Sequence, residues 1–296
     1  MAALAADPIR RRLLLSSTAL AAGVLVLPGR LPPDRLSGAV AAELSELEEI
    51  GAVEDGELVP WVAQMLILML APDLHVEAVV ATAVGESTFQ VWARPEAAVT
   101  AQIDARGWVD LAPTEPSLLA WTLADAIALA AAPGPDGPPR RPIDAARLAS
   151  FEEALADGDH GRAGGVVGDG RGLSADELTV MAALASPHRR TWRITTTWMS
   201  PTGPARRSLS IIATGRGGLW RVDPPGPEPG AAGARQLVPV SPAEVWQHLR
   251  SILPPGTSSS PDDPVHPGRA PCPMRVPPTP TASCDSWPPP ATSTQS

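Results

Sequence analysis

The chain contains few side chains whose types and spacing suit catalysis or metal binding. Asp157, Asp159 and His160 lie together, and carboxylates beside an imidazole can act as an acid–base pair or as metal ligands. Asp159 and His160 lie in residues 158–172 and Asp157 directly precedes them, in a stretch with seven glycines, where a catalytic group cannot be held to within about half an ångström. The composition therefore predicts a mobile, solvated loop here and not a reactive site.

Two further motifs are incomplete. Ser87 lies in the sequence Gly-Glu-Ser-Thr-Phe at residues 85–89, which lacks the second glycine of a nucleophile elbow and predicts a hairpin instead. Residues 168–172 are glycine-rich and precede a helix, but no strand leads into them and no acidic partner follows at the distance that a nucleotide site requires. The histidines show no metal-ligand spacing with one another or with cysteine: His75, His160, His188, His248 and His266. We therefore expect no metal, no cofactor and no catalysis.

The residue types that the chain lacks exclude further functions. It has no lysine, which rules out a P-loop, a pyridoxal phosphate Schiff base and a biotin or lipoate carrier, and no asparagine, which rules out N-glycosylation. Its formal net charge of −9 argues against a continuous basic face for nucleic acid. Residues 254–296 include 13 prolines and predict a disordered tail. Both cysteines, Cys272 and Cys284, lie in that tail, so the folded body, residues 1–253, uses neither disulfide nor thiol chemistry.

Residues 173–253 show the clearest pattern of helices and strands. Two helices begin at capping boxes, a serine followed three residues later by glutamate: residues 173–186 and 241–253. Four strands lie between them: 190–198, 207–213, 219–222 and 236–240. Trp192, Ile194 and Trp198 share one face of the first strand, and prolines confine the fourth to an edge or an end of the sheet. The last helix carries an apolar stripe of Val245, Trp246, Leu249, Ile252 and Leu253.

The first half of the body repeats this order of elements. Residues 34–50 predict an acidic amphipathic helix ended by Gly51, and the apolar residues 58–70 predict a buried core helix too short to span a membrane. Four strands and a helix follow: residues 74–84, 88–94, 97–103, 108–111 and 116–131. The first two strands would meet in a hairpin at 85–87.

The repeated order predicts the fold class, an α+β fold with a quasi-two-fold. The halves, residues 9–131 and 143–253, would merge their strands into one central antiparallel sheet with helical bundles at each side. A proline- and glycine-rich linker, 132–142, and a helix, 143–156, lie between them. We expect the body to be a single domain.

The N-terminus has two interpretations. Three arginines at 10–12 followed by an apolar run to Leu27 resemble a secretory signal, in particular a twin-arginine one, although no small-x-small cleavage site follows. Alternatively, residues 9–15 are a first strand and Ser16 or Ser17 caps a helix that ends near Leu27. We favour the second interpretation because the closing segment of the chain also runs from a strand into a serine-capped helix.

Tryptophan supplies nearly all the aromatic surface, with nine residues against two phenylalanines. Most of them fall on positions that should face the core, including Trp61, Trp121, Trp192 and Trp198. Exposed anchors for a partner protein are expected at Trp92, Trp108 and Trp246.

Four segments together resemble the EspG family of actinobacterial ESX, or type VII, secretion systems. They are residues 49–56, residues 70–72, residues 218–224 and residues 238–242. The resemblance covers roughly residues 10–253 and implies a central antiparallel sheet flanked by two helical bundles. It also implies a cytosolic chaperone without catalysis that binds the apolar tip of PE–PPE helical heterodimers.

Transferred to this chain, the family contact surface lies on the hairpin, the sheet and the last helix. It comprises Gly85, Glu86, Ser87, Thr88, Phe89, Trp92, Trp198, Trp246 and Leu249. The short hairpin at 85–87 departs from the longer loop that members gripping PPE partners often have, which leaves a WXG-type client open. We expect a monomer or weak dimer that binds no nucleic acid and has no stable membrane insertion.

Two other functions remain as alternatives. An exported protein with an extracellular binding role would use the signal-like segment 10–27. A hydrolase would use Ser87 or Asp159 with His160.

Overall fold

The computed structural model describes residues 5–27, 38–129, 143–157, 175–223 and 236–254. Internal contacts divide the chain into two units, residues 1–259 and 260–296, and all described residues belong to the first. Several predicted features lie outside the described residues: the linker, the glycine-rich loop with Asp159 and His160, the serine cap at 174, the tail and both cysteines.

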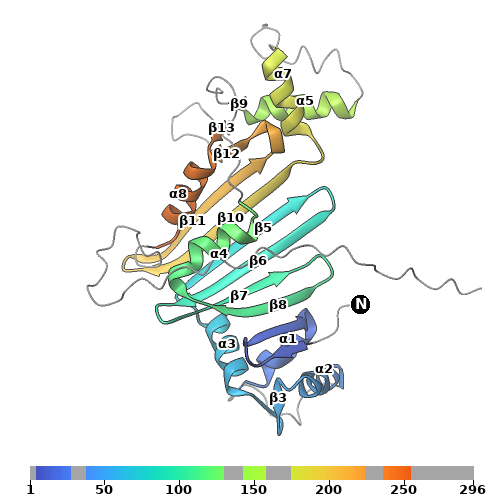
Figure 1. Cartoon of the computed structure of the whole chain (residues 1–296), viewed down its shortest axis with the longest axis vertical. Coiled ribbons are helices and arrows are strands. Elements are labelled where there is room, and N and C mark those ends of the chain that lie inside the picture. Colours follow the sequence, from blue (N-terminus) through green and yellow to red (C-terminus); the bar gives the residue numbers. More distant parts are fainter. Residues whose placement is uncertain (1–4, 28–37, 130–142, 158–174, 224–235, 255–296) are drawn as a thin grey trace, which may run out of the picture. The chain divides into compact units, whose positions relative to one another are not determined.

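The dominant element is one sheet in which eleven strands pair antiparallel, in the order β1-β2-β8-β7-β6-β5-β10-β11-β12-β13-β9 (Figure 1). Its strands are β1 Ala5–Asp7, β2 Arg12–Ser16, β5 Leu74–Thr82, β6 Gly85–Arg94, β7 Ala97–Ile103, β8 Trp108–Thr114, β9 Ile143–Asp144, β10 Arg190–Ser200, β11 Gly203–Ala213, β12 Leu219–Asp223 and β13 Gln236–Val240. A separate two-stranded ribbon joins β3 Val53–Glu54 to β4 Glu57–Leu58. The predicted fold class, an α+β fold built on a large antiparallel sheet with helices, is confirmed.

The helices follow the predicted order, and several begin or end a few residues inside the predicted bounds. They are α1 Ser17–Leu25, α2 Gly38–Glu49, α3 Pro60–Leu70, α4 Leu119–Ala126, α5 Ala145–Ala156, α7 Ala175–Ala185 and α8 Pro242–Ile252, with 3₁₀ turns η2 Pro116–Leu118 and η3 Gly215–Gly217. α8 begins at the predicted capping box, in which Ser241 accepts from the Glu244 N–H and Glu244 accepts from the Ser241 N–H. No described helix is both long and apolar enough to cross a membrane.

The two halves meet at the pairing of β5 with β10, and the same elements occur in the same order on either side of it. α3 leads into β5, β6, β7, β8 and α4, as α7 leads into β10, β11, β12, β13 and α8. The closing helices even share a residue pattern. Leu119, Leu123 and Ile127 lie three, seven and eleven residues after Pro116, and Val245, Leu249 and Leu253 lie at the same distances after Pro242. All six apolar side chains are buried, so both halves use the same register to cover the sheet.

α4 and α8 together cover one face of the central strands. Their stripes pack on alternate residues of the four central strands, among them Val76, Val91, Ile194 and Ile211. Figure 1 shows α4 lying across this part of the sheet. Trp192, Ile194 and Trp198 share this face, as predicted. The Arg207 guanidinium lies 5.1 Å from the centroid of the Trp198 ring. The same guanidinium donates to the Ser251 carbonyl at the end of α8.

The outer parts of the opposite face carry the other two cores. α1, α2 and α3 pack on β2, β7 and β8 through residues such as Leu13, Leu111 and Leu66. α5 and α7 pack on β12 and β13 around Trp220, Phe151 and Met181. On this side the outer clusters reach only the margins of the four central strands, at Trp92 of β6 and Ile212 of β11, and leave the middle of these strands uncovered.

The N-terminal segment forms a strand followed by a capped helix, as favoured from the sequence. Ser16 caps α1 by accepting from the Ala19 N–H, and Leu13, Leu15 and Ala19 are buried. α1 ends slightly earlier than predicted. Removal of this segment as a signal would take β2 and α1 out of the core.

Several boundaries differ from the predicted ones. The turn between β5 and β6 lies at Ala83 and Val84, so residues 85–87, predicted as the hairpin, belong to β6. The helix predicted at 116–131 has a 3₁₀ first turn, and α4 itself ends at Ala126. β1 and β9 were not predicted. β9 pairs with the first two residues of β13, so β13 lies next to the edge, and Pro239 falls in the part that β9 does not reach.

Two predictions of burial are wrong. Trp121 is 66% exposed, because the 3₁₀ turn sets the buried stripe of α4 on Leu119, Leu123 and Ile127. α3 is not buried all round, since Ile67 and Leu70 are exposed.

Truncation of the equivalent core leucines tests the repeated register. We expect Leu123→Ala and Leu249→Ala each to lower the free energy of unfolding by about 2–5 kcal/mol, because both leave a cavity in the same core. Urea denaturation measures this. Leu118→Ala, which truncates a leucine that is 46% exposed, is the matched control and should cost less than about 1 kcal/mol. If Leu118→Ala lowered the free energy of unfolding as much as Leu123→Ala does, the stripe assigned to the core would be wrong.

Candidate partner-binding surface

The uncovered side of the four central strands forms a platform of polar side chains. We define the platform as the residues of β6, β5, β10 and β11 that point away from α4 and α8. Its middle row, in register across the four strands, is Gln90, Glu77, Thr195 and Ser208. Arg193, Arg206 and Ser208 are exposed, and most of the others are half-buried. Such a surface can donate and accept hydrogen bonds but presents little apolar area at its centre.

Apolar side chains stand at the two ends of the platform. Val84, in the turn between β5 and β6, is 98% exposed, and Met199, near the turn between β10 and β11, is 68% exposed. Neither residue could be predicted as a contact from the sequence, because an isolated valine or methionine in a turn region carries no periodic signal. Their positions at opposite ends follow from the antiparallel pairing of β5 with β10.

The five predicted hairpin residues are divided between the two faces of β6. Glu86 and Thr88 pair with Ala81 and Val79 on the platform, whereas Ser87 and Phe89 point to the covered face. Gly85 has a φ of +141°, which favours glycine at the start of the strand. Only part of this predicted set therefore faces the platform.

The remaining predicted contacts do not share one surface. Trp92 is on the platform side, where its ring stacks on that of His75 at 5.5 Å, but Trp198 is on the covered face. Trp246 lies 4.5 Å from Trp121 on the outside of α4 and α8, and Leu249 is fully buried in the core. Leu249 thus supports α8 and is not accessible to a partner.

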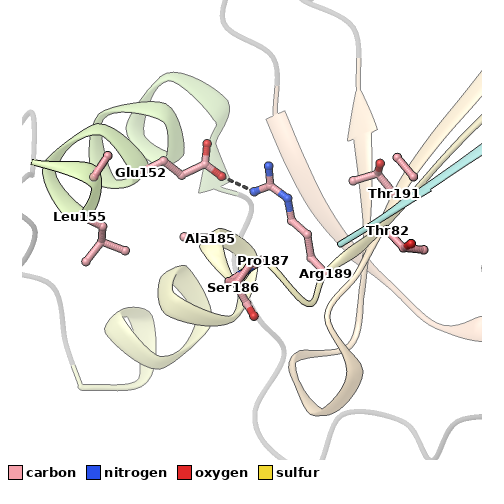
Figure 2. Close-up of a pocket in the computed structure, with 10 residues that line it drawn as sticks. Thr82, Glu152, Leu155, Ala185, Ser186, Pro187, Arg189 and Thr191 are labelled. Carbon is pink, nitrogen blue, oxygen red and sulfur yellow. Dashed lines mark hydrogen bonds and ion pairs between the residues drawn. The ribbon is translucent and has the colours of Figure 1, made fainter. Parts of the chain in front are cut away.

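An open hollow of about 610 Å³ lies where the end of β5 meets α5 and α7. Figure 2 shows Arg189 reaching toward Glu152 of α5, with which it forms an ion pair. Arg189 also donates to the Leu184 carbonyl at the end of α7, at 2.7 Å. The arginine of this hollow is therefore satisfied by the protein itself.

A second hollow, of about 410 Å³, lies at the other end of the platform. It is lined by Pro72 and Asp73 after α3, by His75 of β5, and by Met199 and Arg206 near the turn between β10 and β11. The quasi-two-fold relates the two hollows. The first lies between the end of α7, which precedes β10, and the last residues of β5. The second lies between the end of α3, which precedes β5, and the last residues of β10. Pro72 and Pro187 each lie two residues after the end of their helix.

The described charged groups are arranged as structural ion pairs rather than as a catalytic set. Hydrogen bonds with Asp223 raise the pKa of Arg221, which also contacts His248 of α8. The Ser241 N–H and hydroxyl lower the pKa of Glu244 in the capping box. No group of three or more His, Cys, Asp or Glu residues within the described ranges could hold a metal ion. Ser87 lies within a strand and not at a strand-to-helix turn, which does not fit the nucleophile of a hydrolase.

His75, on the platform side of β5, makes the stability of the fold depend on pH. Burial lowers its pKa, against the opposing effect of Glu77, and its Nε2 atom is buried without a hydrogen-bond partner among the described residues. Since the folded-state pKa lies below the unfolded value of about 6.5, the unfolded chain takes up the proton first as the pH falls. Stability from neutral His75 is complete above that value and is lost below it.

We therefore expect the free energy of unfolding of the wild type to fall more steeply between pH 7 and pH 5 than that of His75→Phe, which keeps a ring against Trp92 but cannot titrate. Urea denaturation at a series of pH values measures the difference. If the free energy of unfolding changed with pH in the same way for both proteins, protonation of His75 would not destabilise the fold.

Comparisons with known proteins agree with this architecture. The sequence profile of the EspG family matches residues 19–251. The structure of the Mycobacterium tuberculosis type VII secretion system chaperone EspG5 in complex with the PE25–PPE41 dimer is similar, with a TM-score of 0.58 and 14% sequence identity. The match covers 84% of this chain and 100% of that chain. A search of curated proteins finds no match. Because the family profile covers most of the folded body, the chain belongs to the EspG family.

Proposed function

We propose that this protein is a chaperone of a type VII secretion system that binds the apolar tip of a PE–PPE-like helical heterodimer. The observation that carries the proposal is membership of the EspG family across residues 19–251. The fold shared with EspG5, which was solved with a PE25–PPE41 dimer, supports it. The proposal includes a cytoplasmic location, a monomeric or weakly dimeric state, a single-domain body over residues 1–253 and no catalysis.

The platform and the turn between β5 and β6 are the surface that we propose for the client. A helical tip with exposed apolar residues needs an apolar contact to stay soluble and polar groups around it to set its orientation. Val84 offers the contact, and Glu86 and Thr88 on the adjoining strand offer polar groups. Trp92 forms the boundary of this surface toward α3, while Gly85, Ser87, Phe89, Trp198 and Leu249 hold the strand and the covered core in place. Trp246 remains a separate proposed contact on the outside of α8.

The described N-terminus favours this function over export. The signal-like segment contributes Leu13, Leu15 and Ala19 to the buried core, and a cleaved signal would remove them. The burial of these residues supports a protein that folds with this segment in place.

Co-expression with the PE–PPE pairs of the source genome tests the function. We expect the tagged full chain to recover at least one heterodimer, and Val84→Asp to weaken that binding about tenfold or more, because a carboxylate would be buried against an apolar tip. Isothermal titration calorimetry measures the affinity.

Ile9→Asp is the matched control, since Ile9 is 93% exposed in the turn between β1 and β2, away from the platform. It should bind as the wild type does. Failure of the wild type to recover any PE–PPE or WXG-type pair would reject the chaperone function. Equal losses in both variants would reject the proposed surface.

A further inference from the structure

The two hollows at the ends of the platform differ in one respect that bears on recognition. Each contains an arginine, but the Arg189 guanidinium is paired with Glu152 and with a helix carbonyl, whereas the Arg206 guanidinium forms no ion pair or hydrogen bond with any described residue. Arg206 is also exposed on the platform face. An arginine held at the rim of a hollow without an acidic partner is a ready site for a carboxylate.

Apart from Asp73, the side chains that line this hollow with Arg206 are uncharged, and most are apolar. His75 stacks on Trp92 to form part of its wall, and burial keeps that imidazole uncharged at neutral pH. Met199, Pro72 and Pro204 add apolar surface on either side. A peptide bound here would bury an apolar side chain and place a negatively charged side chain near Arg206.

The acid at the rim does not cancel the charge of Arg206. Asp73 lines the hollow, but its N–H bonds the Ala93 carbonyl, which places it beside Arg94 at the end of β6. Arg94 caps α3 through two bonds to the Ala71 carbonyl, at 2.6 and 3.0 Å. Asp73 and Arg206 are thus the acidic and the basic residue that line this hollow, and no ion pair joins the two among the described residues.

We propose that this hollow binds an acidic residue flanked by apolar residues, on a second loop of the same client that contacts Val84. The inference rests on the proposed function and adds the chemistry of a second contact. The nine residues of β5 span roughly 30 Å between the two ends. Helices packed side by side have axes about 10 Å apart, so a client end about three helices wide, or two helices with their connecting loops, reaches both. The Glu or Asp carboxylate pairs with Arg206, and its apolar neighbour packs between Met199 and His75.

Methyl NMR with two blocked peptides tests the site without the client. The probes are acetyl-Leu-Glu-Leu-amide and its isostere acetyl-Leu-Gln-Leu-amide, added to the full chain labelled at the methionine methyl groups. We expect the Met199 methyl signal to shift, and the glutamate peptide to bind about fivefold more tightly than the glutamine peptide, as an exposed ion pair allows. Arg206→Gln should abolish that preference.

Arg193→Gln is the matched control, because Arg193 is an exposed arginine on the same face of the neighbouring strand but does not line the hollow. It should keep the fivefold preference. An unmoved Met199 signal, equal binding of the two peptides, or a preference that survives in Arg206→Gln would overturn the inference. Any recovered heterodimer should also bind Arg206→Gln less tightly than Arg193→Gln. Failure to recover a heterodimer would instead count against the chaperone function and leave the peptide result standing on its own.

Discussion

The structure depends on the antiparallel pairing of β5 with β10, the two central strands of the sheet. Eight residue pairs, from Leu74 with Trp198 to Ala81 with Thr191, join the halves into one continuous surface. The buried stripes of α4 and α8 then span the seam, because each helix packs on the same core of alternate residues. Without this pairing each half would expose a long strand edge, which is prone to aggregate.

The same pairing explains why one side of the sheet remains available for binding. α4 and α8 cover the β5–β10 pairing on one side, and the indole rings of Trp121 on α4 and Trp246 on α8 contact each other. On the other side the two outer cores reach only Trp92 of β6 and Ile212 of β11, and the middle strands carry mostly Thr, Ser, Gln and Arg between them. A half-exposed antiparallel sheet with one solvated face is stable on its own, which leaves the platform free for a partner.

Much of the fold could be predicted from the sequence, because the signals were local. Alternation in residues 190–198, the capping box at Ser241 and the matching order of elements identified the sheet, the last helix and the two halves. The exact turn at Ala83 and Val84 was missed because Gly85 resembles a turn residue while serving as the first residue of β6. β9 has only two residues and pairs with the distant β13, which no local pattern reports, and β1, three residues in a hairpin with β2, is too short to show alternation.

The binding surface was harder to predict than the fold. Which face of a strand a residue occupies follows from register, and the sequence could not show that Trp92 and Trp198 point in opposite directions. Exposure of Trp121 followed from a 3₁₀ turn that shifted the helix. The two hollows lie between segments distant in the sequence, such as Pro72 with Met199, so only the fold brings their walls together.

The seam also sets the order of events during synthesis. Leu74 pairs with Trp198, so β5 leaves the ribosome more than a hundred residues before its neighbour exists. During that interval the inner edge of the first half lacks its partner strand, and non-local pairing of this kind slows folding. The nascent first half, with this edge unpaired, is thus the stage of synthesis at which the chain is most prone to aggregate.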